Sequence, residues 1–511
     1  MSRLCEQSVD LKVRGELPRE LEGSLLVACN RRNKDRNVFS RWHDSQTDLV
    51  RIDIMPGKPG KALATVLEVD STGKDVGAQG SDQKAGRSLP VANQSHYLTQ
   101  PNHGLNVENG KLWATNLLFG FPLEVDIRKW ESTRLLQAVD PVDRHQRVTS
   151  TAHFAFSLDR RYAYFHESVL TDELPAKAAD LRLVRMDSRT GSLRVWEMIP
   201  PVEDCSLESA NFHSAFYFEE NGNQFVGLLK TGAVVESLAP HNRPSEHLVM
   251  PSTKSTIWIV PLDTTTDRLQ ARLLPGLSRI DAISLSHLDV DNEGGNGFVL
   301  YANYKEADVA EETHGINVYG EQPSDVTEHY SGMTVEALNV GTVMRVTYRN
   351  GKSRVKRFRR AYNAGRTSLG HSWLPINIQL DTSRKALFCT FSGFRPRLLP
   401  RHIAQAYPGR VVDANSVYYV PPALIRLGAE SMKPDFRESL SHISYAEPIA
   451  MCVVGSVENG FVCTFSPELG LRVYRASDLS RMVAHVTAHP IWHFAHTHFR
   501  PTPAHMKFVA R

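Results

Sequence analysis

The chain has 511 residues, of which 41% are hydrophobic, and its 59 basic and 56 acidic side chains leave a net charge of +3. A chain of this size and apolar content can bury a substantial core, which argues against a predominantly disordered protein. The near balance of charge gives no general attraction to nucleic acid, so partners have to be identified from local motifs.

The N-terminal sequence "MSRLCEQSVDLKVRGELPRE" lacks the apolar core of a secretory signal, and no stretch of the chain approaches the roughly 18 apolar residues of a membrane-spanning helix. Six cysteines are scattered without a CxxC spacing, which disfavours a zinc ribbon or a dense disulfide framework. We therefore expect a cytoplasmic protein whose cysteines are mostly buried, reduced thiols.

Asn-Gly dipeptides between β-rich runs are the strongest local signal in the chain. They occur at 109–110, 221–222, 296–297, 350–351 and 459–460. Asn-Gly accepts positive φ at both central positions of a two-residue hairpin turn. The runs beside these turns, such as "SAFYFEE", "QFVGLL" and "TVMRVTYR", are rich in Val, Phe, Tyr and Thr, as is typical of strands.

Many short antiparallel strands over several hundred residues predict an all-β fold, either a propeller or stacked sandwiches that leave few edges exposed. There is no WD or kelch-like repeat, and no Pro/Ser-rich linker divides the chain. We predict a single domain over residues 1–511, with short helical insertions near 307–312 and 401–407.

The clearest run of charge is the segment "GKSRVKRFRRAYNAGR" at 351–366. Alternation in a strand predicts that Lys352, Arg354 and Lys356 point together toward solvent from one face of a hairpin. Contact with an anionic surface is the alternative interpretation of the same segment.

Three strand-like segments each place one histidine at or just before the start of a β-run. They are "STAHFAFSLDRRYAYF" with His153, "ANFHSAFYFEENGNQFVGLL" with His213, and "ISLSHLDVDNEGGNGFVLYANY" with His287. In a propeller, such strand ends from different blades converge on one axis. Neutral imidazole suits iron, zinc and copper, and a set of four without carboxylates leaves coordination positions open for dioxygen.

The fourth segment, "IWHFAHTHFR" at 491–500, contains three histidines. Side chains alternate in a strand, so His496 and His498 share one face while His493 points to the other. His493 therefore cannot face the same ion as the pair His496 and His498.

Taken in order, these four segments resemble the carotenoid cleavage oxygenase family, whose members share a seven-bladed β-propeller with a central iron(II) held by four histidines. "TAHFAFSLDRRYAYF" is similar to the family's Ala-His segment and the strand that follows it. "NFHSAFYFEENGNQFVG" looks like the second-histidine strand, with Ser214 where the family usually has Asp. "LSHLDVDNEGGNGFVLY" resembles the third-histidine segment loosely, because the usual Asn-Ala-Tyr is absent.

The resemblance is longest at the C-terminus, where the run from "AEPIAMCVVGSVENGF" to "WHFAHTHF" follows the family's last segment. It puts His496, three residues before Phe499, at the ligand position. The N-terminal segments "GELPRELEGSLLVACN" and "RWHDSQTDLVRIDI" also look like the family's entry strands, so the resemblance extends over most of the chain.

The resemblance implies an iron(II) site formed by four histidines, namely His153, His213, His287 and His496. His498 is the alternative to His496. The family orients its ligands with three glutamates. Glu458 matches one of these, whereas Leu118 and Trp373 stand at the other two places. Loss of such a partner typically costs 10- to 100-fold in metal affinity or activity, so a weakened or retuned site is expected.

The function that the resemblance implies is an iron(II)-dependent dioxygenase that cleaves a C=C bond of a carotenoid, apocarotenoid, stilbene or related conjugated terpenoid of secondary metabolism. The expected partners are this apolar substrate and dioxygen, with peripheral membrane contact near the basic run. An apolar tunnel is expected to be lined by Phe119, Phe121, Trp373 and Phe394. The alternatives are a metal-dependent isomerase that rearranges a polyene or terpenoid without cleavage, and a non-catalytic propeller that serves as a binding scaffold.

Overall fold

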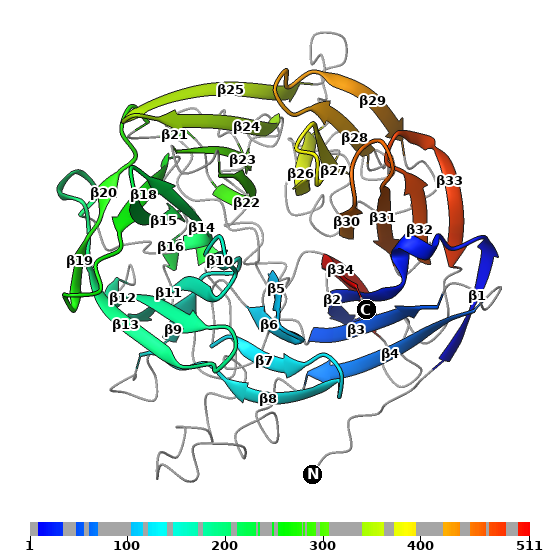
Figure 1. Ribbon diagram of the computed structural model, residues 1–511, viewed down its shortest axis with the longest axis horizontal. Helices are drawn as coiled ribbons and strands as arrows, with labels where there is room; N and C mark the ends of the chain where they lie inside the picture. The colour runs from blue at the N-terminus through cyan, green and yellow to red at the C-terminus, as the bar shows by residue number, and fades with distance from the viewer. Residues whose placement is uncertain are drawn as a thin grey trace, which may run out of the picture.

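The computed structural model describes most of the chain as strands and the turns between them. The described residues are 9–33, 47–55, 61–69, 104–115, 121–139, 147–171, 177–205, 212–230, 234–235, 248–249, 254–277, 280–281, 284–292, 297–305, 340–361, 372–394, 423–439, 450–466, 470–486 and 499–510. These strands form seven blades around a central axis (Figure 1), which confirms the predicted all-β propeller. The helical insertions expected near 307–312 and 401–407 lie outside the described residues.

Four blades are antiparallel meanders of four consecutive strands, with the first strand nearest the centre of the ring (Figure 1). Blade 2 contains β5 (Gly104–Glu108), β6 (Lys111–Thr115), β7 (Leu123–Asp126) and β8 (Glu131–Leu135). Blade 5 contains β22 (Ser284–Asp291), β23 (Phe298–Lys305), β24 (Val340–Arg349) and β25 (Lys352–Ala361). Blade 6 contains β26 (Ser372–Leu380), β27 (Ala386–Phe394), β28 (Ala423–Gly428) and β29 (Pro434–Ser439). Blade 7 contains β30 (Ala450–Val454), β31 (Phe461–Ser466), β32 (Gly470–Arg475) and β33 (Asp478–Val486).

Blades 3 and 4 are less regular. Blade 3 contains β9 (Arg147–Ser150), β10 (Ala155–Phe156), β11 (Tyr162–Leu170), β12 (Ala178–Asp187), β13 (Leu193–Ile199) and β19 (Arg268–Gln270). Blade 4 contains β14 (Phe212–Glu220), β15 (Asn223–Lys230), β18 (Lys254–Pro261), β20 (Arg272–Leu273) and β21 (Ile280–Asp281). A separate ribbon pairs β16 (Val234–Val235) with β17 (Leu248–Val249), and two short 3-10 helices are η1 (Arg19–Leu21) and η3 (Val202–Asp204).

Blade 1 joins the two ends of the described chain. Its innermost strand is β34 (Phe499–Ala510), followed outward by β2 (Gly23–Asn33), β3 (Thr47–Ile54) and β4 (Lys61–Val69). β34 pairs antiparallel with β2 along its whole length. β1 (Val9–Gly15) pairs with β4 through residues 9–12 and with β33 of blade 7 through residues 13–15. Blades 7 and 1 are therefore one continuous nine-stranded sheet, and the ring has no free edge at this junction.

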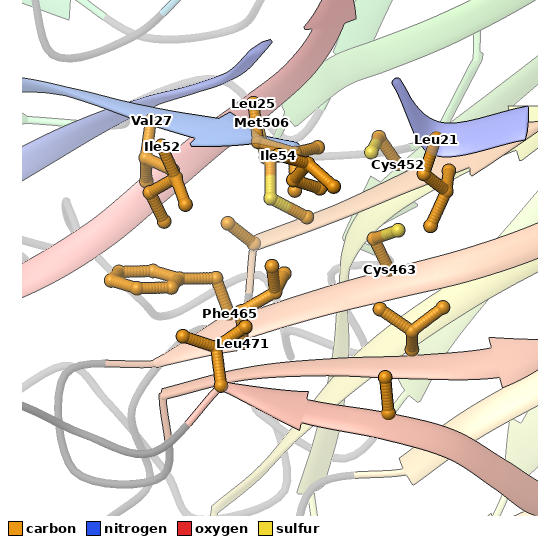
Figure 2. Close-up of a cluster of buried hydrophobic side chains, with 14 of the residues drawn as sticks. Leu21, Leu25, Val27, Ile52, Ile54, Cys452, Cys463, Phe465, Leu471 and Met506 are labelled. Carbon is orange, nitrogen blue, oxygen red and sulfur yellow. The ribbon is translucent and has the colours of Figure 1, made fainter. Parts of the chain in front are cut away.

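The core lies between neighbouring blades. Between blades 7 and 1, aliphatic residues of β2 and β3 pack on Cys452, Cys463 and Leu471, with Met506 of β34 among them (Figure 2). Cys389, Cys452 and Cys463 are buried free thiols, as expected, while Cys205 is exposed. Among the described residues, no helix is long and apolar enough to cross a membrane.

Three of the predicted Asn-Gly turns are confirmed as two-residue hairpins with positive φ at both positions. Their φ values are 50° and 72° at 109–110, 51° and 78° at 221–222, and 50° and 73° at 350–351. The prediction at 459–460 is wrong, because a longer loop separates β30 from β31 and its positive φ lies at Gly455. Asn296 lies outside the described residues.

The basic run begins with the predicted alternation. Lys352, Arg354 and Lys356 of β25 are exposed, whereas Ser353 and Val355 between them are partly buried. This confirms that the first half of the run is the solvated face of a hairpin.

The turns that follow the innermost strands contact one another around the ring. Gly297 N–H donates to the carbonyl of Glu219 at 3.2 Å, and Thr382 N–H donates to that of Gly455 at 3.1 Å. Ion pairs also link neighbouring turns, namely Arg160 with Glu108, Arg384 with Asp291, and Lys385 with Glu458. These contacts place the turns together on one face of the propeller.

Asp381 forms the most extensive of these links. Its buried carboxylate accepts backbone N–H groups from Ser383, Lys385 and Ala386 within its own turn, and from Val457 of blade 7 at 2.8 Å. Burial opposes ionisation, but the hydrogen bonds, including those from Ser383, Ala386 and Val457, hold the pKa of Asp381 below its ordinary value. One carboxylate thus fixes both a turn and a contact between blades.

We expect Asp381→Ala to lower the free energy of unfolding by about 3 kcal/mol, because four buried donors lose a charged acceptor. Urea denaturation followed by circular dichroism measures this change. Glu458→Ala is the matched control in the same contact between blades, and it should leave stability nearly unchanged because exposed ion pairs contribute little. Equal effects of the two substitutions would contradict the assigned role of Asp381.

Candidate metal centre

Two of the four predicted ligands, His153 and His213, lie side by side at the junction of blades 3 and 4. His153 stands in the short link between β9 and β10, and its backbone forms a parallel bridge with Ser214 of β14. The His153 N–H donates to the carbonyl of His213 at 3.2 Å, and Ala215 N–H donates to the carbonyl of His153 at 2.9 Å. Backbone hydrogen bonds therefore set the separation of the two histidines.

The imidazole rings of His153 and His213 have the spacing of two ligands on one ion. Their centroids are 5.2 Å apart and their planes are inclined by 32°. Two imidazoles that bind one ion through nitrogens at about 2.1 Å, in neighbouring positions, have centroids roughly 4.5 to 5.5 Å apart. The spacing of these two rings is thus compatible with the binding of one metal ion.

His213 forms a side-chain hydrogen bond with its neighbour in the chain. Its side chain is buried, and Nδ1 hydrogen bonds the Ser214 hydroxyl at 3.2 Å. Such a bond at one ring nitrogen orients a ligand histidine and leaves the other nitrogen for the ion. Ser214, where the resembled family usually has Asp, can thus orient the ring, and Nε2 of His153 is likewise shielded from solvent.

The other two predicted ligands are only partly described. His287 lies on β22, the innermost strand of blade 5, next to blade 4 (Figure 1). The register of β22 against β23 shifts between Leu285 and Leu288, which places the backbone of His287 within a bulge. His496, His498 and His493 lie outside the described residues. Within the described part of the chain, no group of three or more His, Cys, Asp or Glu side chains is close enough to hold a metal ion.

Glu458 forms an ion pair with a lysine of the neighbouring blade. It stands in the loop after β30, about half exposed, and its carboxylate accepts from Lys385 Nζ at 2.6 Å, which lowers the pKa of Glu458. His213 stands at the start of an innermost strand, whereas Glu458 follows the end of one. The predicted interaction of Glu458 with a ligand imidazole stays a prediction.

The other residues expected near the site are described unevenly. Leu118 and Phe119 lie outside the described residues, and only the strand positions of Trp373 on β26 and Phe394 on β27 are described. Phe121 is buried in a cluster with Val139, Val148 and Val169. The rest of the expected tunnel stays a prediction.

Sequence reasoning missed Glu167, which lies fully buried on β11. Its Oε2 atom accepts N–H groups from Ala138 at 2.8 Å and Val139 at 3.3 Å, while its Oε1 atom has no hydrogen-bond partner among the described residues. Desolvation raises the pKa of Glu167 to about 8, although the two backbone bonds act in the opposite direction. The carboxyl group is therefore mostly protonated at neutral pH.

Glu167 belongs to a wider set of buried polar atoms without partners among the described residues. On the adjacent strands β9 and β11 these are Thr149 Oγ1, Ser150 Oγ, both ring nitrogens of His166, and Glu167 Oε1. Burial lowers the pKa of His166 to about 3, so its ring is neutral, and it packs edge-on against Phe212. The available sequence signal was the polar pair His-Glu within the apolar run "YAYFHESVL".

Comparison with known proteins identifies the fold. No protein-family model matches the chain, and no curated protein matches it. Among solved structures, a point mutant of Synechocystis apocarotenoid oxygenase aligns with a TM-score of 0.58 at 13% identity, covering 100% of this chain and 97% of its own. The cobalt-substituted form of the same enzyme aligns with a TM-score of 0.57, the same identity and the same coverage. The chain thus shares the fold of these apocarotenoid oxygenase structures.

We expect Glu167→Gln to remove a pH dependence of stability. Because the pKa of Glu167 is raised in the folded state, its protonated form contributes to the free energy of unfolding. This contribution is fully present below pH about 4.5 and is lost as the pH rises through about 8. Glutamine keeps an acceptor for Ala138 and Val139 but cannot ionise. The variant should therefore gain stability relative to the wild type between pH 5 and pH 9, by on the order of 3 kcal/mol.

Urea denaturation at a series of pH values measures this difference. Glu131→Gln, at the exposed first residue of β8, should follow the wild-type profile. Parallel profiles for Glu167→Gln and the wild type would show that Glu167 is not held neutral.

Proposed function

We propose that this chain is an iron(II)-dependent dioxygenase that oxidatively cleaves a C=C bond of a carotenoid, apocarotenoid, stilbene or related conjugated terpenoid. The observation that carries the proposal is the paired imidazoles of His153 and His213, held 5.2 Å apart between neighbouring blades of a propeller with this fold. A fold alone does not assign an activity, so the proposal depends on the site. One structural neighbour, the cobalt-substituted apocarotenoid oxygenase, is itself a protein that accepts a transition metal.

In the proposed site His153, His213, His287 and His496 hold the iron(II), with His498 as the alternative to the last. Bound iron(II) supplies the binding and activation of dioxygen. The chain contributes neutral donors, since no carboxylate belongs to this set. The hydroxyl of Ser214 orients the ring of His213 through its Nδ1 atom.

The protein also controls access to the centre. The side chain of His213 and Nε2 of His153 are shielded from water, which protects a reactive centre from side reactions. The backbone bonds between His153, His213 and Ala215 fix the positions of the two histidines before any ion binds. The substrate is an uncharged, apolar molecule, and contact with a membrane surface through the exposed Lys352, Arg354 and Lys356 stays a prediction.

A second function is a metal-dependent isomerase that rearranges a polyene or terpenoid without cleaving it. The observation that favours it is the changed support of the ligands: Glu458 pairs with Lys385, and Leu118 and Trp373 stand at the other two glutamate places. Partners of this kind tune the metal, so their replacement can change the reaction while the ligands are kept.

Replacing His213 tests the metal site directly. After anaerobic reconstitution, the wild type should contain close to one iron per chain, and His213→Ala should lose at least 10-fold in both iron content and turnover. His485→Ala, on the outermost strand β33 of blade 7, is the control and should retain both. An iron-loaded, active His213→Ala protein would refute the assignment, and a wild type that takes up no iron would favour a binding scaffold.

Oxygen consumption and product analysis separate the two enzymatic functions. Cleavage consumes dioxygen and gives paired aldehydes or ketones, whereas isomerisation gives a product of unchanged mass without oxygen uptake. Mass spectrometry of reactions with a panel of carotenoids, apocarotenoids, stilbenes and terpenoid polyenes shows which outcome holds.

A further inference from the structure

Ser150 and Glu167 place two buried polar side chains opposite each other inside blade 3. The residues are directly opposite each other in the pairing of β9 with β11, so their side chains share one face of the sheet. Both side chains are fully buried, and neither Ser150 Oγ nor Glu167 Oε1 has a hydrogen-bond partner among the described residues. Leaving a buried polar atom unpaired is unfavourable, so native proteins rarely do so unless a water or a ligand completes it.

Apolar side chains lie next to this pair on the same face. Val148 and Val169 are the next directly opposed residues of β9 and β11, and they pack with Phe121 and Val139. In the other direction along the chain, His153 follows Ser150 by three residues, a reach of roughly 10 Å in extended backbone. Along β9 the pair therefore lies between this apolar cluster and the segment that leads to His153.

The chemistry of the pair selects an uncharged oxygen. Glu167 is mostly protonated at neutral pH and offers an O–H donor, and the Ser150 hydroxyl can both donate and accept. Arg182, opposite Glu167 on β12, pairs with Asp180 instead. A hydroxyl or carbonyl group satisfies these two side chains, whereas an anion finds no free cation among the described residues on this face.

We propose that Ser150 and Glu167 form a specificity subsite that hydrogen bonds a neutral oxygen atom of the substrate, so that the chain selects an oxygenated polyene or terpenoid over its hydrocarbon counterpart. This inference rests on the proposed function, from which the polyene or terpenoid class is taken. A buried site built to hydrogen bond a substrate oxygen rejects the analogue without it, because its polar groups are then left unpaired. Because the subsite lies on the strand that leads to His153, it also fixes how the substrate is positioned relative to the metal.

Binding to the metal-free full-length protein tests the subsite. The probes are an apocarotenal and a hydrocarbon polyene of the same chain length, in the same detergent. The affinity for each ligand is measured by the quenching of tryptophan fluorescence. The wild type should bind the apocarotenal at least 10-fold more tightly. Ser150→Ala should lose most of this preference by weakening apocarotenal binding 5- to 10-fold, without changing binding of the hydrocarbon.

Two further variants separate recognition from folding. Glu167→Gln keeps a donor at the same place and should keep the preference, whereas Glu167→Leu should lose it. Ser168→Ala is the matched control, because Ser168 lies next to Glu167 on the opposite face of β11 and its hydroxyl already donates to the carbonyl of Val169. Its ligand preference should equal that of the wild type.

Equal binding of the two ligands by the wild type, binding of neither, or an equal effect of Ser150→Ala on both would overturn the subsite. These outcomes are distinct from failure of the proposed function. If the metal-free protein discriminates but the iron-loaded protein neither consumes oxygen nor forms cleavage products, the subsite stands and the dioxygenase proposal fails. If the loaded enzyme cleaves polyenes and the metal-free protein binds both ligands equally, the dioxygenase stands and the subsite fails.

Discussion

The pairing of β34 with β2 is the constraint on which the arrangement of the other blades depends. A propeller places ligands from different blades on one axis only if the ring is closed, and here closure uses strands from the two ends of the described chain. β1 strengthens this junction by pairing with β4 of blade 1 and β33 of blade 7. The hydrophobic core shown in Figure 2 fills the space between these two blades. The separation of His153 and His213 is then set locally, by backbone bonds between blades 3 and 4.

The two faces of the ring have different tasks. On one face, turns are joined by carboxylates such as Asp381 and by ion pairs such as Lys385 with Glu458. The starts of the innermost strands carry His153 and His213, together with polar side chains of β9 and β11 that lack partners among the described residues. Satisfied polar groups stabilise a scaffold, whereas unsatisfied buried ones indicate where a ligand completes the structure.

Local patterns in the sequence predicted the strands and several turns well. Asn-Gly predicted the hairpins at 109–110, 221–222 and 350–351 because positive φ is a property of those two residues alone, and alternation predicted the exposed face of β25. The prediction of a turn at 459–460 was wrong because hydrogen bonds with blade 6 determine the conformation of the loop after β30. No local sequence pattern indicates these contacts.

The candidate site was predictable only where one residue type carries the signal. Histidines before strands identified His153 and His213, whose rings the fold brings together. Ser150 and Glu167 were missed because a serine and a glutamate in a strand normally face water. Their burial follows from the packing of Ala138, Val139 and Phe121 against blade 3, which depends on tertiary structure.

The continuous sheet across blades 7 and 1 has a consequence for biosynthesis. The ribosome completes β2 long before β34 emerges, so the inner edge of β2 stays without its partner while nearly all of the remaining chain is made. Such an edge is open to pairing with another chain. Final folding therefore follows translation of the last strand, and protection of the nascent N-terminal sheet decides how much of the protein reaches the closed ring.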